Sequence, residues 1–342
     1  MLNRTTQALV PTLNPYVTDY LHVTPEVAEA HTKRWIEQFD QEDRDVILEE
    51  TRFILDRNYL PISEFKRNIA MLFGKGVWGD AGGTAIQQAR FITQHSGKGQ
   101  SAIFQLVDQY MTREYGLTIE QCGLEQPEQF LFIDDCAFTG NTALADVVKA
   151  IGSSPTMRYL HLWFMAGYTS GINYLQNQLQ VICQARGIDL KIWCGRTYCD
   201  SVTDPTLDVM RPCRTLCQQN IGVPFVARQM RGVAVPNSVF RADAFPPVET
   251  LFSNSTARRI LEQAFLLQGI DLVSACSAPR PDMKPLGFVQ GQSFGFGAMV
   301  FTYRNTPNNC PLVMWWGDPE KYGPNHPLGQ WYPLLPRNVR GA

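Results

Sequence analysis

The 342-residue sequence lacks any long hydrophobic run. Its longest apolar stretch, residues 159–168, contains a histidine and is far shorter than the roughly 20 apolar residues that a membrane-spanning helix needs. The first seven residues, MLNRTTQ, lack the apolar core of a secretory signal peptide. Hydrophobic residues make up 44% and charged residues 18% of the chain, which is typical of a globular protein. We therefore expect a soluble, cytoplasmic protein with no membrane partner.

Two common binding signatures are also missing. The nine cysteines are scattered and form no C-x-x-C pair, so we expect free, mostly buried thiols. Lys98 is followed by glycine rather than by serine or threonine, so the loop around it is not a Walker loop. Four cysteines come closest to a zinc pattern, but core or surface thiols account for them better: Cys194, Cys199, Cys213 and Cys217.

The most informative stretch that is present runs from residue 130 to residue 142 and reads FLFIDDCAFTGNT. Residues 130–133 have the length and composition of a buried strand. Asp134 and Asp135 follow where that strand is expected to end, and a short turn leads into a helix predicted over residues 143–150. In open α/β sheets, ligands lie at the carboxyl ends of strands and phosphates bind at helix N-termini. The stretch therefore has the arrangement of a ligand site.

Its side chains and backbone suit a ribose 5-phosphate. Successive N–H groups of the loop can surround a phosphate, with two threonine hydroxyls beside them and a glycine that permits close approach. The two aspartates can take the vicinal hydroxyls of the ribose, directly or through Mg²⁺. The alternative is an ordinary strand, turn and helix, with Asp and Thr at the turn and cap positions that they favour. The predicted phosphate- and ribose-binding residues are Phe138, Thr139, Gly140, Asn141 and Thr142.

An apolar strand, two acids, a spacer and Thr-Gly-x-Thr resemble the loop that binds phosphoribosyl pyrophosphate (PRPP) in type I phosphoribosyltransferases. Asn141 stands where many members carry glycine. The resemblance implies that Asp134 and Asp135 are catalytic and hold Mg²⁺ through the ribose hydroxyls. The residues that match the motif position by position are Asp134, Asp135, Thr139, Gly140 and Thr142.

A second loop, residues 95–101, precedes an amphipathic helix predicted over residues 102–115. In the family a loop after an earlier parallel strand holds pyrophosphate, which gives that role to Ser96, Gly97 and Lys98; a solvated turn explains these residues equally well. Many phosphoribosyltransferases insert a β-hairpin after this loop, and its long loop closes over the substrates. The short separation between Gly97 and Asp134 leaves no room for it, so either another segment performs the closure or the chain binds phosphoribosyl compounds without transferring them.

Strand and helix patterns alternate from about residue 88 to residue 195, which predicts a parallel, doubly wound sheet with right-handed crossovers. Its strands are expected near residues 89–94, 130–133, 158–166 and 188–194. The fold class is α/β, a Rossmann-like, phosphoribosyltransferase-like parallel sheet with an N-terminal helical cap and a C-terminal aromatic-rich β extension. The expected domains are residues 1–75 as the cap, 76–200 as the core, and 201–342 as an extension that completes the core or forms a hood.

Two details of the flanking segments can be tested directly. Thr24 and Pro25 mark a helix start, and that helix is expected to bury Val27, Trp35 and Phe39. Near the C-terminus, Gly297–Tyr303 and Pro311–Trp316 are predicted as two strands. The candidate base-binding residues of this region, for which core packing is the alternative, are Asn308, Asn309 and Trp316.

A closer resemblance rests on motifs spread over most of the chain. Trp35 with Gln38-Phe39, the IDDCAFTGNT loop, Thr306–Asn309 before Trp315-Trp316, and a closing Pro-Leu-Leu-Pro-Arg are similar to the phosphoribosyltransferase-like effectors of bacterial conflict systems. Some of these are encoded beside retron reverse transcriptases. The resemblance implies a toxin-like antiviral effector held in check by a partner, such as a retron reverse transcriptase with its msDNA or a DNA-binding protein.

Three functions are compatible with these observations. The first is a transferase or glycosidase-like enzyme that acts at the anomeric carbon of PRPP, a nucleotide, NAD or a nucleic-acid end. The second is a non-catalytic sensor of PRPP or a nucleotide, and the third is a structural subunit that binds a nucleic-acid 5′-phosphate. The paired aspartates favour the enzyme, and the missing hairpin favours the sensor.

Overall fold

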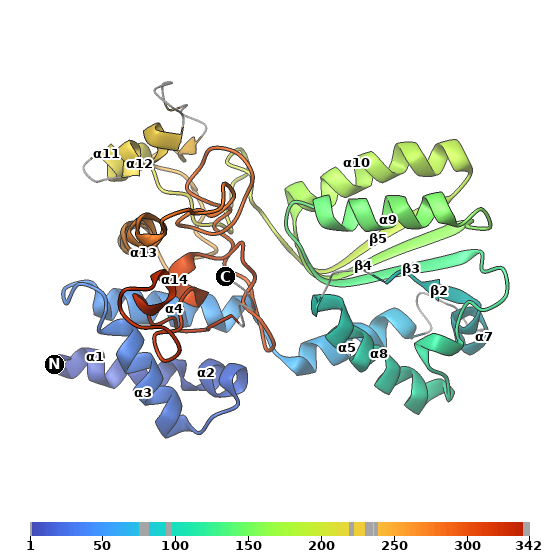
Figure 1. Cartoon of the computed structure of the whole chain (residues 1–342), viewed down its shortest axis with the longest axis horizontal. Helices are drawn as coiled ribbons and strands as arrows, with labels where there is room; N and C mark the ends of the chain where they lie inside the picture. Colours follow the sequence, from blue (N-terminus) through green and yellow to red (C-terminus); the bar gives the residue numbers. More distant parts are fainter. Residues whose placement is uncertain are drawn as a thin grey trace. The chain divides into compact units, whose positions relative to one another are not determined.

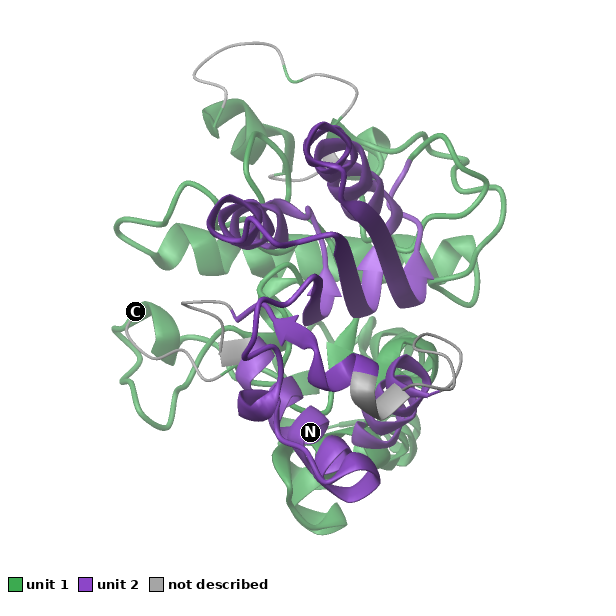
Figure 2. Cartoon of the chain, turned by 90° about the vertical axis from the view of Figure 1, so that its right-hand side faces the viewer, with its two compact units in different colours: residues 1–61, 202–342 green, residues 62–201 purple. Residues whose placement is uncertain are grey.

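The computed structural model describes residues 2–74, 82–93, 98–218, 222–229, 235 and 239–337, without the side chains of residues 82–84, 98–99 and 217–218. The chain forms two compact units, Ile62–Ser201 and a second unit that combines Met1–Pro61 with Val202–Ala342 (Figure 2). The predicted division into three consecutive segments differs from this, because both ends of the chain belong to one unit. Within the described residues, no helix is long and apolar enough to cross a membrane.

The unit Ile62–Ser201 is built on a four-stranded parallel sheet with the strand order β2-β3-β4-β5. This arrangement confirms the predicted α/β class. The strands are β2 (Ala89–Phe91), β3 (Gln129–Ala137), β4 (Tyr159–Tyr168) and β5 (Asp189–Tyr198). Figure 1 shows α9 (Asn141–Ser153) and α10 (Thr169–Arg186) on one face of the sheet, and α5 (Ile62–Phe73) and α8 (Lys98–Tyr115) on the other. The described residues of this unit also form the helix α7 (Gly82–Gln87) and the short 3₁₀ helix η3 (Ile119–Gln121).

Side-chain alternation explains how the sheet holds these helices. Every second residue of a strand points to the same face, and on β3 and β4 the face toward α9 and α10 is apolar up to Phe132 and Phe164. The residues of this face pack against the inner faces of the two helices in one cluster that includes Phe130, Phe132, Leu162, Val147 and Leu175. Nine of the ten β4 residues are buried, as expected for a central parallel strand covered on both faces. This core fixes the carboxyl edge of the sheet, where the loops after β3 and β4 lie.

The second unit consists of helices and irregular segments. Its helices are α1 (Arg4–Leu9), η1 (Val10–Leu13), α2 (Asn14–Leu21), α3 (Pro25–Ile36), α4 (Arg44–Asn58), α11 (Arg214–Gln218), α12 (Gly222–Gln229), α13 (Ser255–Ala275), α14 (Leu312–Trp315) and η5 (Pro327–Gly329). Two short strands, β1 (Tyr59–Leu60) and β6 (Phe301–Thr302), pair in parallel.

A buried ion network holds part of the irregular chain on α13. Arg258 contacts Glu249 at 2.8 Å and Glu262 at 3.1 Å, and Arg241 contacts the same Glu262 at 2.7 Å. Arg258 also donates to the Leu207 carbonyl oxygen at 2.9 Å. Because buried charges must be paired, the network explains how Arg241 and Arg258 can be buried.

Three local predictions for this unit are wrong. The strand predicted over Gly297–Tyr303 is reduced to Phe301–Thr302. The segment predicted as a strand over Pro311–Trp316 contains the helix α14, which starts directly after Pro311. Val27 is 51% exposed, because the buried face of α3 passes through Ala28 and Trp35; Val27 lies one position outside it.

Candidate active site

The two adjacent aspartates lie inside β3, because the strand continues to Ala137 instead of ending at residue 133. Asp134 is still paired with β4, opposite Phe164. On the other side, β2 pairs only with residues 129–131 of β3. Both carboxyl side chains are half-buried. The aspartates therefore stand at the carboxyl edge of the sheet, beyond the paired length of β2.

The orientation of these carboxylates follows from strand geometry. One oxygen of Asp134 accepts a hydrogen bond from the N–H of Asp135 at 2.9 Å, and one oxygen of Asp135 accepts from the N–H of Cys136 at 2.8 Å. Successive side chains of a strand point to opposite faces. The pair is therefore better placed to contact two neighbouring groups of one ligand, such as vicinal hydroxyls, than to chelate one ion directly with both carboxylates.

The loop after β3 is a three-residue bend, 138–140, that leads directly into α9. Gly140 precedes the helix with a φ of 76°, a left-handed conformation that glycine adopts without strain. The N-cap residue of α9, Gly140, has no side chain with which to cap the helix, and Asn141 and Thr142 are exposed. The first N–H groups of a helix have no intrahelical acceptor, so this terminus can bind an anion.

The first turn of α10 sets the position of this bend. A Cβ atom added at Gly171 would lie 2.0 Å from the carbonyl oxygen of Phe138. A Cβ atom at Gly140 would lie 2.8 Å from the Gly171 carbonyl oxygen. Only hydrogen atoms fit between the two segments, so the loop rests directly on the α10 backbone.

The N-terminus of α10 is occupied by a side chain of the protein itself. Asp200 accepts hydrogen bonds from the N–H of Ser170 at 3.0 Å and from the Thr169 hydroxyl at 3.1 Å, and it also contacts the Ser170 hydroxyl. A carboxylate at this position uses the groups that a phosphate would need. Of the two helices that start at the carboxyl ends of β3 and β4, α10 thus has a carboxylate at its first turn, whereas the N-cap of α9 is a glycine with no side chain.

One residue that joins the strands of the site was assigned to a loop in the sequence. Gln100, in the first turn of α8, is 2% exposed. Its side-chain amide donates to the carbonyl oxygens of Ile92 and Ile133, each at 3.0 Å. It thereby fixes β3 against the segment after β2 immediately before Asp134. No local pattern marks this role, because both acceptors are backbone groups.

Aromatic side chains form a row across the same edge of the sheet. The ring centroids of Phe138 and Tyr168 are 5.7 Å apart, and those of Tyr168 and Tyr198 are 5.5 Å apart. Burial raises the pKa of Tyr198, with the Arg196 guanidinium opposing the shift. Arg196 in turn forms a two-point ion pair with Glu64 of α5. Because both tyrosines are buried, the row supports the loop by packing rather than offering a surface for stacking.

The described structure does not test the roles predicted for the other site residues. Ser96 and Gly97 lie outside the described residues, and Lys98 is the first residue of α8, with its side chain not described. The candidate base-binding residues belong to the other unit. There, the Asn309 amide donates to the Phe288 carbonyl oxygen at 2.8 Å, and Trp316 is only 8% exposed. Pyrophosphate and base binding by these two groups stay predictions.

The donor set at the sheet edge fits a hard cation that retains other ligands. No cluster of three or more His, Cys, Asp or Glu side chains suitable for a metal occurs in the part of the chain that the structure describes. Mg²⁺ usually takes one or two carboxylates, with water and substrate oxygens completing its shell. Asp134 and Asp135 can supply such carboxylates.

The eight cysteines whose side chains are described are all free thiols.

Comparison with known proteins gives one match. A family model described as PRTase-CE matches residues 32–337, which include both aspartates and the N-terminus of α9. Searches of curated proteins and of solved structures returned no match.

Proposed function

Because this chain belongs to the PRTase-CE family and is a phosphoribosyltransferase-like protein, we propose that Asp134–Thr142 bind the ribose 5-phosphate of PRPP or a related nucleotide. The observation that carries this proposal is the N-terminus of α9, preceded by a left-handed glycine and by two carboxylates on the same strand. We call Asp134–Thr142 the cradle.

Each part of the cradle has a distinct role in the proposed complex. The N–H groups around Thr139–Thr142 bind the 5′-phosphate, helped by the positive end of the α9 dipole. The hydroxyls of Thr139 and Thr142 add donors. Asp134 and Asp135 accept hydrogen bonds from the ribose hydroxyls and thereby fix the sugar ring. Mg²⁺, held near Asp134 and Asp135 through these hydroxyls, would neutralise charge on a pyrophosphate leaving group.

The proposed reaction is substitution at the anomeric carbon. The bond between that carbon and the pyrophosphate oxygen breaks, the oxygen keeps the electron pair, and a nucleophile or water forms the new bond. The contribution of the protein is positioning and electrostatic stabilisation. The fixed ribose lets Asp134 and Asp135 face the positive charge that develops on the sugar ring.

One observation favours a non-catalytic sensor instead. Residues 98–128, all described, contain α8 and η3 and no strand. The β-hairpin that closes over the substrates in many phosphoribosyltransferases therefore has no counterpart between the second loop and β3. Without closure, water reaches the anomeric carbon and a bound ligand exchanges easily. A sensor that reads PRPP or a nucleotide needs only the cradle.

We also propose a biological setting, from the resemblance of the motifs at both ends of the chain to conflict-system effectors. In it, the protein is a cytoplasmic, toxin-like effector of antiviral defence. Its partner is a retron reverse transcriptase with msDNA or a DNA-binding protein, and a nucleic-acid 5′-phosphate is the alternative ligand. The motif residues are well ordered within their unit: Gln38 exchanges hydrogen bonds of 2.7 and 2.8 Å with the Tyr332 backbone.

The test is to incubate the purified chain with PRPP, Mg²⁺ and a panel of nucleotides and bases, and to measure both binding and pyrophosphate release. We expect PRPP binding that needs Mg²⁺ and is weakened about ten-fold or more in Asp134→Asn/Asp135→Asn, because hydrogen bonds to charged groups contribute about 1.5–3 kcal/mol each. Asp189→Asn, an exposed aspartate at the opposite end of the sheet, on β5, is the matched control.

The results of this test distinguish the enzyme from the non-catalytic sensor. Tight PRPP binding without pyrophosphate release would reject the enzyme and retain the sensor. A double-asparagine variant that binds PRPP as tightly as the wild type would remove the two aspartates from the proposed site. The same variant tests the defence proposal: full protection or toxicity in cells would show that the cradle is not used there.

A further inference from the structure

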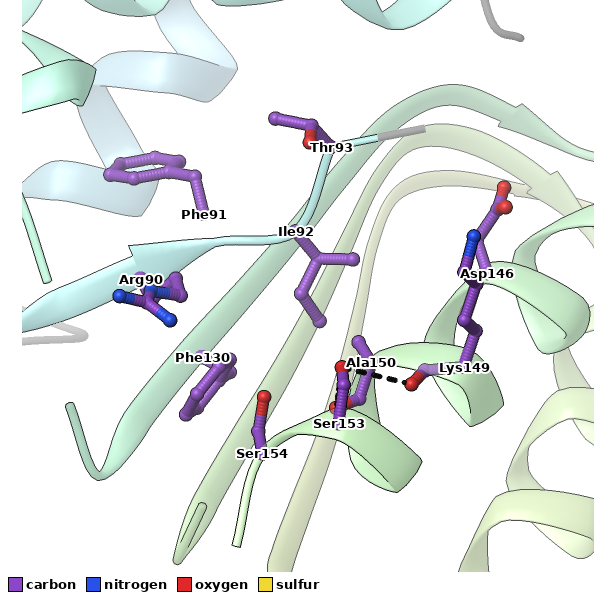
Figure 3. Close-up of a pocket in the computed structure, with 10 residues that line it drawn as sticks. All are labelled: Arg90, Phe91, Ile92, Thr93, Phe130, Asp146, Lys149, Ala150, Ser153 and Ser154. Carbon is purple, nitrogen blue, oxygen red and sulfur yellow. Dashed lines mark hydrogen bonds between the residues drawn. The ribbon is translucent and has the colours of Figure 1, made fainter. Parts of the chain in front are cut away.

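A cavity of about 320 Å³ lies between the edge strand β2 and helix α9 (Figure 3). None of the cradle residues lines it. Its walls include the outer flank of α9 from Asp146 to Ser153 and the strand residues Arg90 and Ile92. It is thus a separate hollow on the helix whose first turn belongs to the cradle.

The floor of the cavity is apolar and firmly packed. Ile92 is 6% exposed and Phe130 is 1% exposed. Both belong to the core cluster between the sheet and the α9–α10 layer, and Ala150 of α9 packs against that cluster. These side chains close the bottom of the cavity and present little of their own surface to it, so the groups on its rim decide which ligand it can take.

The rim is polar and carries a net positive charge. Figure 3 shows Arg90 on the strand side of the cavity and Lys149 on the helix side. Hydroxyl groups of Ser153 and Ser154 complete one end, and Asp146 is the acid in the lining. Two cations against one carboxylate favour an anionic ligand.

Arg90 is positioned without being neutralised. Its guanidinium donates to the carbonyl oxygen of Gly123 at 2.9 Å. This acceptor is neutral and does not compensate the positive charge, and the guanidinium has other N–H groups that can bind a ligand. Gly123 is close to the strand: a Cβ atom added there would lie 2.7 Å from the Cα of Arg90. This contact holds the loop carrying the acceptor against β2, so the guanidinium has a fixed anchor.

From these features we propose that the cavity is a second ligand site, for a small organic anion of mononucleotide size. Arg90 and Lys149 bind the anionic group, and the rest of the molecule fills the cavity above Ile92 and Phe130. The volume is at the lower end of the about 300–1,000 Å³ of small-molecule sites, which suits one small molecule and not a polymer. This site goes beyond the proposed cradle and does not depend on it.

The experiment uses the full chain with the cradle closed by Thr142→Asp. An aspartate in the first turn of α9 is compatible with the helix dipole and repels a phosphate at that position. AMP, GMP, CMP and UMP are each titrated calorimetrically into this variant, with inorganic phosphate as a further probe. Lys149→Ala and Arg90→Gln are then added separately. Lys191→Ala, an exposed lysine on the opposite edge strand, is the matched control.

We expect at least one nucleotide to bind the Thr142→Asp chain. Lys149→Ala and Arg90→Gln should each weaken that binding about ten- to a hundred-fold, as expected for loss of a charge-assisted contact. Lys149→Arg and Lys191→Ala should leave it within about two-fold, since Lys149→Arg keeps the charge and Lys191 is remote. Lys149 is exposed on a helix, where alanine is well tolerated.

Three results would overturn the proposal. No nucleotide binds the Thr142→Asp chain at millimolar concentration; the Lys149 and Arg90 variants bind as tightly as their parent; or inorganic phosphate binds as tightly as any nucleotide, so that the rest of the molecule contributes nothing. PRPP binding to the Lys149→Ala chain with an intact cradle is measured in parallel. Loss or retention of PRPP binding in that variant reports on the cradle alone. A failure of the cradle proposal can therefore be told apart from a failure of the second-site proposal.

Discussion

Two glycines show how closely single residues define the cradle. Gly140 needs its left-handed backbone to turn the chain from β3 into α9. Gly171 lies on a different element, the first turn of α10, and is needed because the Phe138 carbonyl oxygen occupies the space of its missing side chain. One glycine acts through its own conformation and the other through the space it leaves.

Gly171→Ala is predicted to move the cradle and weaken ligand binding. The new methyl group would meet the Phe138 carbonyl oxygen at 2.0 Å, so one of the two backbones must shift. We expect a loss of about 1–3 kcal/mol in the free energy of unfolding, typical of overpacking. We also expect a fall of at least about ten-fold in PRPP affinity, because the N–H groups would leave their positions. Urea unfolding and calorimetric titration measure the two effects.

Gly152→Ala in α9 is the matched control. A Cβ atom added at Gly152 meets no atom within 4 Å, and alanine in a helix is favoured over glycine by about 0.5–1 kcal/mol. This variant should be as stable as the wild type or more so, with unchanged PRPP affinity. If Gly171→Ala behaved in the same way, the tight contact between α10 and the cradle would not be needed for stability or for PRPP binding.

At the scale of elements, α9 and α10 are two similarly placed helices with different N-termini. Each follows a strand of the same sheet and packs its apolar face on the same core. The start of α10 is bound by Asp200, which comes from the segment after β5, whereas the N-cap of α9 is Gly140, which has no side chain. This difference selects one of two equivalent helix ends for an anion.

Asp200→Ala is predicted to destabilise the chain by about 1–2 kcal/mol, the usual range for loss of a helix cap together with a favourable dipole contact. Because α10 supports the cradle, PRPP affinity should fall as well. Asp200→Asn keeps an oxygen acceptor and should lose less stability. Urea unfolding of the full chain measures the difference.

Asp189→Ala is the control at the other end of β5. Asp189 is exposed and makes only a 3.9 Å ion pair with Lys191, so its removal should change stability by less than about 0.5 kcal/mol. Equal stability of Asp200→Ala and the wild type would contradict the capping role of Asp200.

For the whole molecule, the closing segment of the chain is bound to the N-terminal helices. Tyr20 donates its hydroxyl to the Pro336 carbonyl oxygen at 2.9 Å. His31 contacts the Leu334 carbonyl oxygen at 2.8 Å through Nε2 and the Tyr332 hydroxyl at 2.6 Å through Nδ1. Both imidazole nitrogens are thus engaged when the ring is neutral and protonated on Nε2. These long-range contacts unite the two ends of the chain in one unit.

Stability is therefore predicted to fall on acidification through His31. Burial lowers its pKa below the ordinary value; hydrogen bonds to the Leu334 and Pro333 carbonyls and the nearby Glu320 oppose the shift, while Arg34 adds to it. The unfolded chain then binds more protons than the folded chain below about pH 6.5. The stabilisation of the neutral ring is present above that pH and is lost as the pH falls toward the lower folded pKa.

The measurement is the free energy of unfolding at pH 7.5 and at pH 5.5 for the wild type and His31→Gln. The variant should be less stable at pH 7.5 but should lose less on acidification. The control is His22→Asn, an exposed site with a φ of 56° that asparagine tolerates; it should keep the wild-type slope. Identical slopes for wild type and His31→Gln would assign the acid sensitivity to other groups.

Local patterns were sufficient to predict the core unit and the position of its loop. The alternation of strands and helices, the apolar run before Asp134, and the glycine before the α9 start all depend on residues close together in sequence. The parallel sheet and the α/β class followed from them. Prediction was poorer in the C-terminal half, where prolines and aromatics pack without regular periodicity; there Leu312–Trp315 forms a helix in place of the expected strand.

The sequence by itself determined the chemistry available at the cradle: two adjacent carboxylates, two threonines and a glycine at a strand-to-helix junction. Tertiary structure decided which groups support it. Gln100, Gly171 and Asp200 act through backbone atoms or helix ends that are distant in sequence, and such contacts leave no local signature. The same holds for the second cavity, because Arg90 and Lys149 become neighbours only when α9 packs beside β2.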